Sequence, residues 1–263
     1  MGWCNFVFLK MVSIVILGSG NVATHLLDAF IQADDVEIKM VYGRNLEALQ
    51  TFADSIPATS CIDNIPLADV YILAISDSSI TEVSELLKHR AGLVVHTSGS
   101  ESIKALKVKR KGVFYPLQTF TKGKKVDFLK IPICIEATDS TDYELLESLG
   151  KAISKRVLPI SSEQRKKLHL SAVLVNNFPN YLFTIAHEIC AENDISFDLL
   201  QPLIFETVDK IQFLHPSKAQ TGPARRNDIE TIQRHLEQLT NPLHKQIYLL
   251  MSESIKKHYE KEL

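Results

Sequence analysis

The sequence predicts a doubly wound, mostly parallel α/β sheet followed by an all-helical C-terminal region. Short apolar, β-prone runs alternate with helical patterns over the first 160 residues, as in a sheet with helices on both faces. One run, 68–76, is apolar almost throughout, which is typical of a strand that is covered on both faces. No convincing strand follows residue 161. We therefore expect two domains, 1–160 and 161–263.

The elements expected in the first domain follow the chain in order. Strands are expected at 12–17, 36–42, 68–76, 92–97, 112–115, 131–136 and 156–158, and helices at 21–33, 46–54, 79–89, near 103 and at 143–153. In the second domain, Ser161 and Gln164 predict a capping box for a long helix through Asn193, which Pro179 is expected to kink or break. Further helices are expected at 197–213, 225–239 and 242–258. Met11 directly precedes the first strand, so we interpret residues 1–10 as an extension.

Composition narrows the class of protein. The net charge of −2 over 263 residues argues against nucleic acid as a partner, and the short lysine clusters at 107–111 and 122–125 are typical of solvated surfaces. The four cysteines show neither metal-ligand spacing nor a disulfide pattern, which favours reduced thiols in a cytoplasmic protein without a metal site. No apolar run is long enough for a membrane helix, and no signal peptide is expected.

The first strand leads into a glycine-rich turn, with the sequence G-S-G-N-V-A at 18–23. Gly18 permits a tight turn, Gly20 allows a pyrophosphate to approach the backbone, and Ala23 allows close packing of helix on strand. A helix N-terminus also offers free N–H donors to an anion. The alternative is an ordinary strand–helix turn. The strand–turn–helix context favours a dinucleotide site, with Gly18, Ser19, Gly20, Asn21 and Val22 as binding residues.

The end of the second strand indicates which dinucleotide binds. This strand ends in Tyr42-Gly43-Arg44-Asn45, without the carboxylate that usually binds the ribose hydroxyls of NAD. Arg44 can bind a 2′-phosphate, and Asn45 can add a donor. The alternative is a solvent-facing arginine at the edge of the sheet. We predict NADP as the cofactor.

Small polar residues follow the next two strands. Ile75 and Ser76 end one strand, and Thr97 and Ser98 end the next. Ligands of open α/β sheets bind outside the carboxyl ends of strands, so these residues are candidates for lining the cofactor path. Serine and threonine at such positions are also common helix caps, which is the alternative interpretation.

Two polar groups of the helical domain are candidates for chemistry. His169 and Asn176, with Asn180 and His187 beyond them, share one face of an unbroken helix within apolar surroundings. They could serve a ligand, or they could be core or dimer-interface residues. The turn at Gly222-Pro223 precedes Arg225, Arg226 and Asp228. The arginines could bind a substrate carboxylate while Asp228 orients a polar partner, or the group could form a surface ion pair.

Four segments carry a resemblance to a known superfamily. They are G-S-G-N-V-A-T-H-L at 18–26, Y-P-L-Q-T-F at 115–120, H-L-S-A-V-L-V-N-N-F at 169–178 and T-G-P-A-R-R-N-D at 221–228. Together they resemble Rossmann-like proteins with a helical C-terminal domain of unknown function. These are related to pyrroline-5-carboxylate reductase, ketopantoate reductase, 6-phosphogluconate-type dehydrogenases and deazaflavin-dependent NADP reductases.

The resemblance implies a reductase whose Pro-containing loop lies near the nicotinamide, with Gln118 and Thr119 as substrate-binding residues. Some relatives carry a lysine on the first long helix with an asparagine four residues on. Here neither Lys166 nor Lys167 has that asparagine, so His169 is the nearest candidate proton donor.

Our first hypothesis is an NADP-dependent oxidoreductase that reduces a small 2-oxo acid or imino acid, with a ketopantoate-like substrate as the first choice. His169 would donate a proton, Asn176 would polarise the carbonyl, and Arg226 would bind the carboxylate. The alternative is a non-catalytic NADP-binding scaffold or sensor that acts through its helical domain. In both cases we expect a homodimer through the helical domain, because about 100 helical residues bury a limited core alone.

Overall fold

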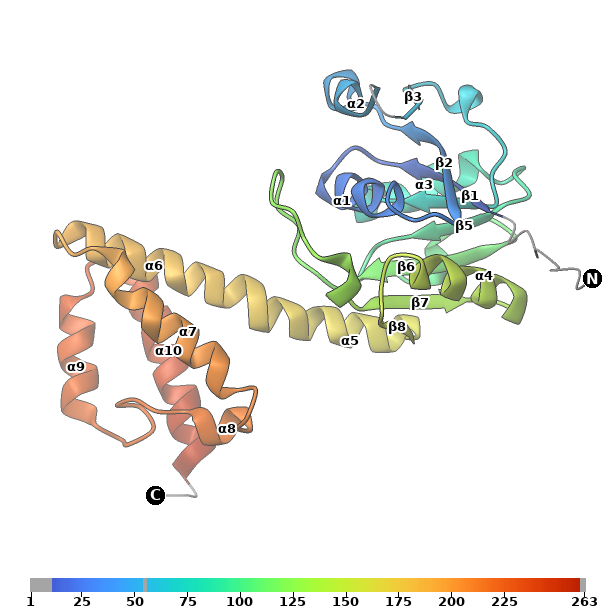
Figure 1. Ribbon diagram of the computed structural model, residues 1–263. Coiled ribbons are helices and arrows are strands. Elements are labelled where there is room, and N and C mark those ends of the chain that lie inside the picture. Colours follow the sequence, from blue (N-terminus) through green and yellow to red (C-terminus); the bar gives the residue numbers. More distant parts are fainter. Residues whose placement is uncertain (1–10, 54–55, 261–263) are drawn as a thin grey trace, which may run out of the picture. The chain divides into compact units, whose positions relative to one another are not determined.

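Figure 1 shows the computed structural model, which describes residues 11–53 and 56–260. The proposed extension at residues 1–10 lies outside the described residues. The chain divides into two compact units, Met1–Asn176 and Asn177–Leu263. The sheet ends near residue 160, where the sequence places the domain boundary, but the compact units divide one helix later. The reason is that helix α5 (Ser162–Ala172) bonds to the sheet through the buried Arg165.

An eight-stranded sheet forms the centre of the first unit, in the order β3-β2-β1-β4-β5-β6-β7-β8. All neighbouring strands are parallel except β6 and β7, which are antiparallel. This confirms the doubly wound, mostly parallel sheet. The strands are β1 (Val12–Leu17), β2 (Val36–Tyr42), β3 (Ala58–Thr59), β4 (Val70–Leu73), β5 (Leu93–His96), β6 (Lys111–Pro116), β7 (Ile133–Ala137) and β8 (Val157–Pro159).

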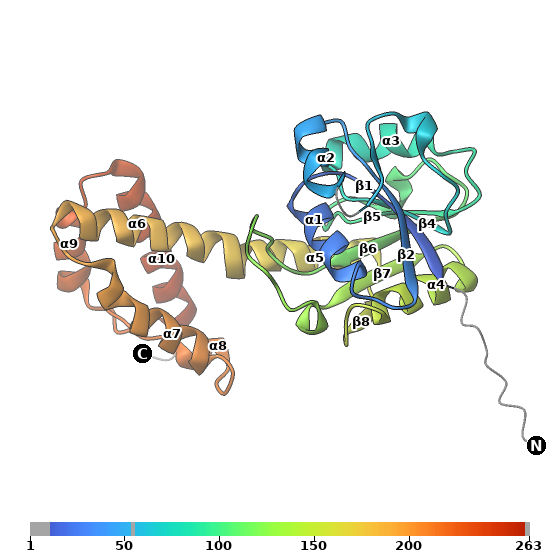
Figure 2. The same cartoon turned by 45° about the horizontal axis from the view of Figure 1, so that its top comes forward.

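Both faces of the sheet are buried, because helices pack on each. On one face, Ile14 and Ile16 of β1 belong to an apolar core that includes residues of α1 (Asn21–Phe30) and α4 (Ser140–Lys151). On the other face, Val15 and Leu17 of β1 belong to a second core, which includes Ile80 of α3 (Ile80–Leu86). Figure 2 shows these helices around the sheet. Alternate side chains of a strand point to opposite faces, so a strand buried on both sides is apolar throughout.

Several predicted boundaries differ from the structure. The short strand β3 is absent from the prediction because its two residues carry no periodicity. The helix near residue 103 is a 3-10 turn at Ile103–Ala105, and α2 (Leu46–Ala53) closely matches its predicted range. Helix α1 ends at Phe30, three residues earlier than predicted. The alternation of strands and helices is otherwise as expected.

The predicted long helix is not broken at Pro179. Helix α5 leads into a π-helical segment, Val173–Asn177, and α6 (Phe178–Glu192) follows without a non-helical residue. A proline cannot donate to the carbonyl four residues earlier, and its ring crowds that carbonyl. The wider π turn just before Pro179 accommodates this, so the helical path changes register and does not end.

The second unit is helical, as predicted. Prolines start α7 (Gln201–Lys210), α8 (Pro216–Ala219) and α10 (Pro242–Tyr259) within their first two residues, where no intrahelical N–H bond is lost. Helix α9 (Ile229–Gln238) begins later than the predicted residue 225, because Asn227 takes a left-handed conformation with φ of 56° and Asp228 caps the helix. Within the described part of the chain, no helix combines the length and the apolar character needed to cross a bilayer.

Candidate functional site

The predicted cofactor residues lie along one edge of the sheet. Strands β1, β4, β5 and β6 are mutually parallel, so their carboxyl ends meet at the same edge. We call the turns that follow these strands the rim: residues 18–20 after β1, 74–79 after β4, 97–101 after β5 and 117–121 after β6. The rim therefore collects segments that lie far apart in the sequence.

The glycine-rich turn has the geometry that a pyrophosphate requires. Gly18 has φ of +137°, and a Cβ there would lie 2.1 Å from the carbonyl oxygen of Ala74, so only glycine fits this turn. Gly20 is the N-cap of α1 and makes no side-chain cap, and the space that its Cβ would take is open. Ala23 is 1% exposed and packs on the core. An uncapped helix N-terminus beside an open approach fits a dinucleotide phosphate.

The tip of β2 lies next to this turn. A Cβ on Gly43 would lie 3.3 Å from the Ser19 Oγ, so the two turns are in close contact. Arg44 follows Gly43 and is exposed. Asn45 accepts a hydrogen bond from the Ala48 N–H at 3.1 Å, in the first turn of α2. Arg44 therefore follows the residue that contacts the glycine-rich turn, and Asn45 uses its side-chain oxygen in the first turn of α2. Contact of either residue with a cofactor stays a prediction.

The polar side chains after β4 and β5 form hydrogen bonds within the rim. Ser76 bonds the Ser79 hydroxyl at 2.9 Å, and the Thr97 hydroxyl donates to the Leu73 carbonyl at 3.3 Å. The Ser98 hydroxyl accepts from two main-chain N–H groups, at 3.1 and 3.0 Å, and so shapes the turn after β5. Ile75 lies half-buried at the same edge. These side chains hold the rim in shape, and their contact with a cofactor stays a prediction.

His169 lies against the turn after β5. Its Nδ1 is 3.2 Å from the hydroxyl of Tyr115, the two rings meet edge to face, and Tyr115 comes from the end of β6. A Cβ on Gly99 would lie 2.5 Å from Nδ1 of His169 and 2.9 Å from Cζ of Tyr115, so glycine is required at this close approach. Burial raises the pKa of Tyr115 to about 12, which keeps its hydroxyl protonated. The pair can bind and transfer a proton at the rim.

A buried polar network lies below this pair. Arg165 is fully buried and donates to Glu136 at 2.6 Å and to the carbonyl oxygen of Ser98 at 3.1 Å. His96 ends β5, where its Nδ1 accepts from the Ser98 N–H at 3.2 Å and its Nε2 has no partner among the described residues. Burial, with the nearby Arg165 charge, lowers the pKa of His96 to about 4, so its ring is neutral.

Sequence reasoning missed Arg165 and Glu136. Arg165 precedes two lysines and resembles the solvated side of a helix, and no local signal marks it as buried. The resemblance implies that the segment 115–120 lies near the nicotinamide, but no pattern in the sequence marks Tyr115 as a proton-handling group. The capping box of Ser161 and Gln164, which the structure confirms, sets the start of α5 and so could have placed Arg165 one helical turn before His169.

The loop after β6 is fastened to α1. The side-chain amide of Asn21 donates to the Phe120 carbonyl at 3.0 Å, and the ring nitrogens of His25 lie 2.7 Å from the Asn21 carbonyl oxygen and 2.9 Å from that of Lys124. The side chains of Gln118 and Thr119 are exposed on this loop. The loop therefore carries its predicted substrate residues close to the glycine-rich turn.

The remaining predicted residues belong to the π-helical segment and to the helical unit. Asn176 is exposed in the π-helical segment. In the helical unit, the Arg225 guanidinium donates to the carbonyls of Ser217 and Gln220 and stacks 4.6 Å from the Tyr259 ring centroid, a structural role. Asp228 caps α9 by accepting from the Thr231 N–H, and this bond lowers its pKa. Arg226 is exposed. Roles in catalysis or substrate binding for these residues stay predictions.

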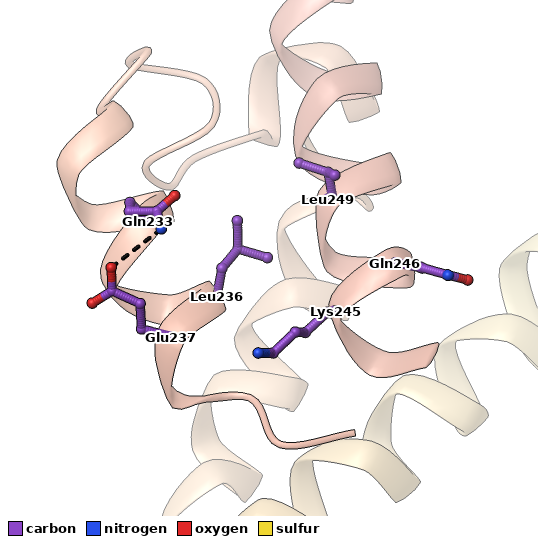
Figure 3. Close-up of a pocket in the computed structure, with 6 residues that line it drawn as sticks. All are labelled: Gln233, Leu236, Glu237, Lys245, Gln246 and Leu249. Carbon is purple, nitrogen blue, oxygen red and sulfur yellow. Dashed lines mark hydrogen bonds between the residues drawn. The ribbon is translucent and has the colours of Figure 1, made fainter. Parts of the chain in front are cut away.

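Neither of two hollows is lined by the predicted residues. One, of about 320 Å³, lies between α9 and α10, where Leu236 and Leu249 face the space between the helices (Figure 3). Polar side chains surround it, and Gln233 bonds Glu237 at 3.2 Å. The other, of about 680 Å³, lies between α1, residues 125–129 and the end of α4. Across residues 11–53 and 56–260, no group of three metal-binding side chains gathers.

The fold and the rim define a dinucleotide-binding protein of the Rossmann class, and comparison with known proteins agrees. Residues 13–98 match the family of coenzyme F420-dependent NADP oxidoreductases, and residues 131–255 match the domain of unknown function DUF2520. No protein of curated function matches the chain.

Solved structures identify the family. A Bacteroides fragilis protein with the provisional name of an NADP oxidoreductase is 37% identical over 95% of this chain and 99% of its own, with a TM-score of 0.89. This chain belongs to that family, in which an NADP-oxidoreductase-type domain precedes the DUF2520 domain.

More distant structures share the fold. A reductive aminase from Aspergillus terreus, solved with NADPH and ethyl levulinate, is 12% identical to this chain, with a TM-score of 0.68. The match covers 96% of this chain and 95% of the aminase. A pyrroline-5-carboxylate reductase from Coxiella burnetii is 18% identical to this chain, with a TM-score of 0.53. The match covers 96% of this chain and 94% of the reductase.

Proposed function

We propose that this protein is an NADPH-dependent reductase of a small 2-oxo acid or cyclic imino acid. The observation that carries the proposal is the His169–Tyr115 pair beside Gly99, on the rim that also holds the glycine-rich turn. A proton-handling pair next to a nicotinamide site is what reduction of a C=O or C=N bond requires. The name of the Coxiella neighbour, a pyrroline-5-carboxylate reductase, supports a cyclic imino acid, and the Aspergillus reductive aminase was solved with a carbonyl compound beside NADPH.

The residues present fit a phosphorylated dinucleotide. The N–H groups at the start of α1 would bind the pyrophosphate, because Gly20 leaves their approach open. The exposed guanidinium of Arg44 would bind the 2′-phosphate, which favours NADP over NAD. The turns after β4 and β5 would line the path between the pyrophosphate and the His169–Tyr115 pair.

Each residue of the pair has a distinct role in the proposed reaction. When bound, the reduced nicotinamide supplies a hydride to the carbon of the C=O or C=N bond. The protonated ring of His169 gives its Nε2 proton to the oxygen or nitrogen of that bond and is left neutral. The Tyr115 hydroxyl holds Nδ1 and fixes the orientation of the ring. Its raised pKa keeps Tyr115 protonated throughout.

The test is oxidation of NADPH, followed by absorbance, with a panel of 2-oxo acids and cyclic imino acids. We expect His169→Gln to lower kcat by about 10²- to 10⁴-fold, the usual contribution of a general acid, without changing NADPH affinity. Tyr115→Phe should lower kcat less, because it removes only the orienting bond. His89→Gln is the matched control, since His89 is exposed after α3 and should leave kcat unchanged.

Other outcomes decide against the reductase. Tight NADPH binding without turnover of any compound, and without an effect of His169→Gln, would favour the scaffold or sensor hypothesis. Absence of binding to NADPH and to NADH would contradict both hypotheses.

We further propose that the protein is a homodimer through its helical unit. Taken by itself, this unit exposes large apolar side chains on and before α7, among them Leu199 at 72%, Leu203 at 63% and Phe205 at 70%. Soluble monomers rarely expose such clustered apolar surface. Light scattering after gel filtration should give twice the mass of the chain, and Phe205→Glu should give the monomer.

A further inference from the structure

Arg165 joins three parts of the first unit. Its Nε donates to the Ser98 carbonyl at 3.1 Å, one terminal nitrogen donates to Glu136 on β7 at 2.6 Å, and the other donates to the Glu101 carbonyl. The same terminal nitrogen lies 3.2 Å from the Ser162 hydroxyl, which in turn donates to Glu136. One side chain therefore connects α5, β7 and the turn after β5.

The geometry of this contact is specific to a guanidinium. A charge that is 0% exposed is costly unless it is paired and its donors are used, and Glu136 supplies the pairing charge. The other two nitrogens donate to main-chain oxygens at both ends of the turn 98–101, and one of them also lies within hydrogen-bond distance of the Ser162 hydroxyl. A lysine carries its three donors on a single nitrogen, so it cannot span acceptors that lie around the edge of a planar guanidinium.

The turn that Arg165 holds is the turn that His169 approaches. Arg165 and His169 are four residues apart on α5, so they share one face of the helix. Arg165 bonds the carbonyl of Ser98, and His169 lies against the next residue, Gly99, with no room for a Cβ between them. The distance between α5 and the turn after β5 therefore sets where the imidazole lies.

We propose that Arg165 is a positioning residue that holds the His169–Tyr115 pair at a fixed distance from the turn after β5. The inference rests on the proposed function for its catalytic consequence, but its structural half can be tested without turnover. Arg165 itself does not touch the reacting atoms. It acts by holding α5 and the turn 98–101 together.

The experiment compares the buried Arg165 with Arg110, whose side chain is 41% exposed. Arg110 also pairs with a carboxylate, Asp142, and donates to a main-chain carbonyl, that of Ala91. It directly precedes β6, at the opposite end of that strand from Tyr115. Arg165→Lys and Arg110→Lys therefore each disturb an arginine–carboxylate pair, but only the first lies beside His169.

We expect both variants to lower Tm, and only Arg165→Lys to lower kcat, by about 10- to 100-fold, the cost of misplacing a reacting group by about 1 Å. The affinity for NADPH should fall less than kcat, since the glycine-rich turn proposed to bind the pyrophosphate is built from other residues. If Arg165→Lys does not fold, Glu136→Gln, which keeps the shape of the acceptor, should give a smaller change in the same direction. Equal kcat in wild type and in the folded variant would overturn the proposal.

The ring ¹⁵N chemical shifts of His169 give a readout that needs no substrate. In Tyr115→Phe these shifts report a ring that has lost its partner. We expect the shifts in Arg165→Lys to move toward those of Tyr115→Phe, and those in Arg110→Lys to stay at the wild-type values. Unchanged shifts in Arg165→Lys would overturn the positioning role, even if the wild-type protein reduced no compound. Absence of turnover together with the expected shifts would count against the proposed function alone.

Discussion

Replacing Gly20 with alanine should separate cofactor binding from folding. Gly20 has φ of −85° and ψ of −175°, which alanine adopts without strain, and nothing lies within 4 Å of the Cβ that the change would add. The new methyl group would stand in open space at the N-terminus of α1. A pyrophosphate needs that same space to reach the main-chain N–H groups.

The open space at Gly20, with general interaction energies, gives the expected size of both effects. A hydrogen bond to a charged group is worth about 1.5–3 kcal/mol, so loss of one such bond should weaken NADPH binding about 10- to 100-fold. The free energy of unfolding should change by less than about 1 kcal/mol, because no contact is lost and alanine reduces the freedom of the unfolded chain.

Gly18→Ala is the contrasting variant. Residue 18 has φ of +137°, and the Cβ that the change adds would lie only 2.1 Å from the Ala74 carbonyl oxygen. Strain and overpacking together should cost about 2–6 kcal/mol, a large share of the stability of a domain.

Calorimetric titration with NADPH measures the first effect, and thermal unfolding measures the second. We expect Gly20→Ala to keep the wild-type Tm and lose affinity, and Gly18→Ala to lose stability. The reasoning is refuted if Gly20→Ala binds NADPH with wild-type affinity, because the phosphates would then not lie against this helix. A large drop in Tm for Gly20→Ala would show that the turn is crowded and would equally contradict it.

Three further predictions concern charge and pH. Arg44→Ala should weaken NADPH binding about 10-fold at low salt and leave NADH binding unaffected, since only a 2′-phosphate would meet this exposed cation. Equal losses of affinity for NADPH and NADH would exclude the phosphate contact. His96 has its pKa lowered from 6.5 to about 4, so the unfolded chain takes up the proton first, and stability should fall by up to about 3 kcal/mol as pH drops through that window. Urea unfolding should show this loss and its disappearance in His96→Asn, whereas an equal loss in both proteins would contradict it. Asp228→Ala should lower Tm and Asp228→Asn should keep the wild-type Tm, because asparagine also caps a helix. Loss of turnover in both variants at unchanged Tm would instead support the predicted catalytic role of Asp228.

The sequence was sufficient for the architecture because the relevant physics is local or periodic. Alternation of strands and helices, the apolar β4 region and the glycines at 18 and 20 each follow from neighbouring residues. The capping box at Ser161 is equally local, and the structure confirms it. The boundary of α9 was wrong because the left-handed conformation of Asn227 and the cap by Asp228 displaced the predicted start.

Only the tertiary structure shows which distant residues meet. Tyr115 and His169 are 54 positions apart, and Arg165 lies 67 positions from Ser98, so no spacing rule could pair them. Arg165 in particular appears on the chain as one of three consecutive basic residues, yet the packing of α5 on the sheet buries it and leaves its two lysine neighbours exposed. Periodicity specifies the face of a helix, whereas the fold decides what that face contacts, because burial depends on elements brought together from the whole unit.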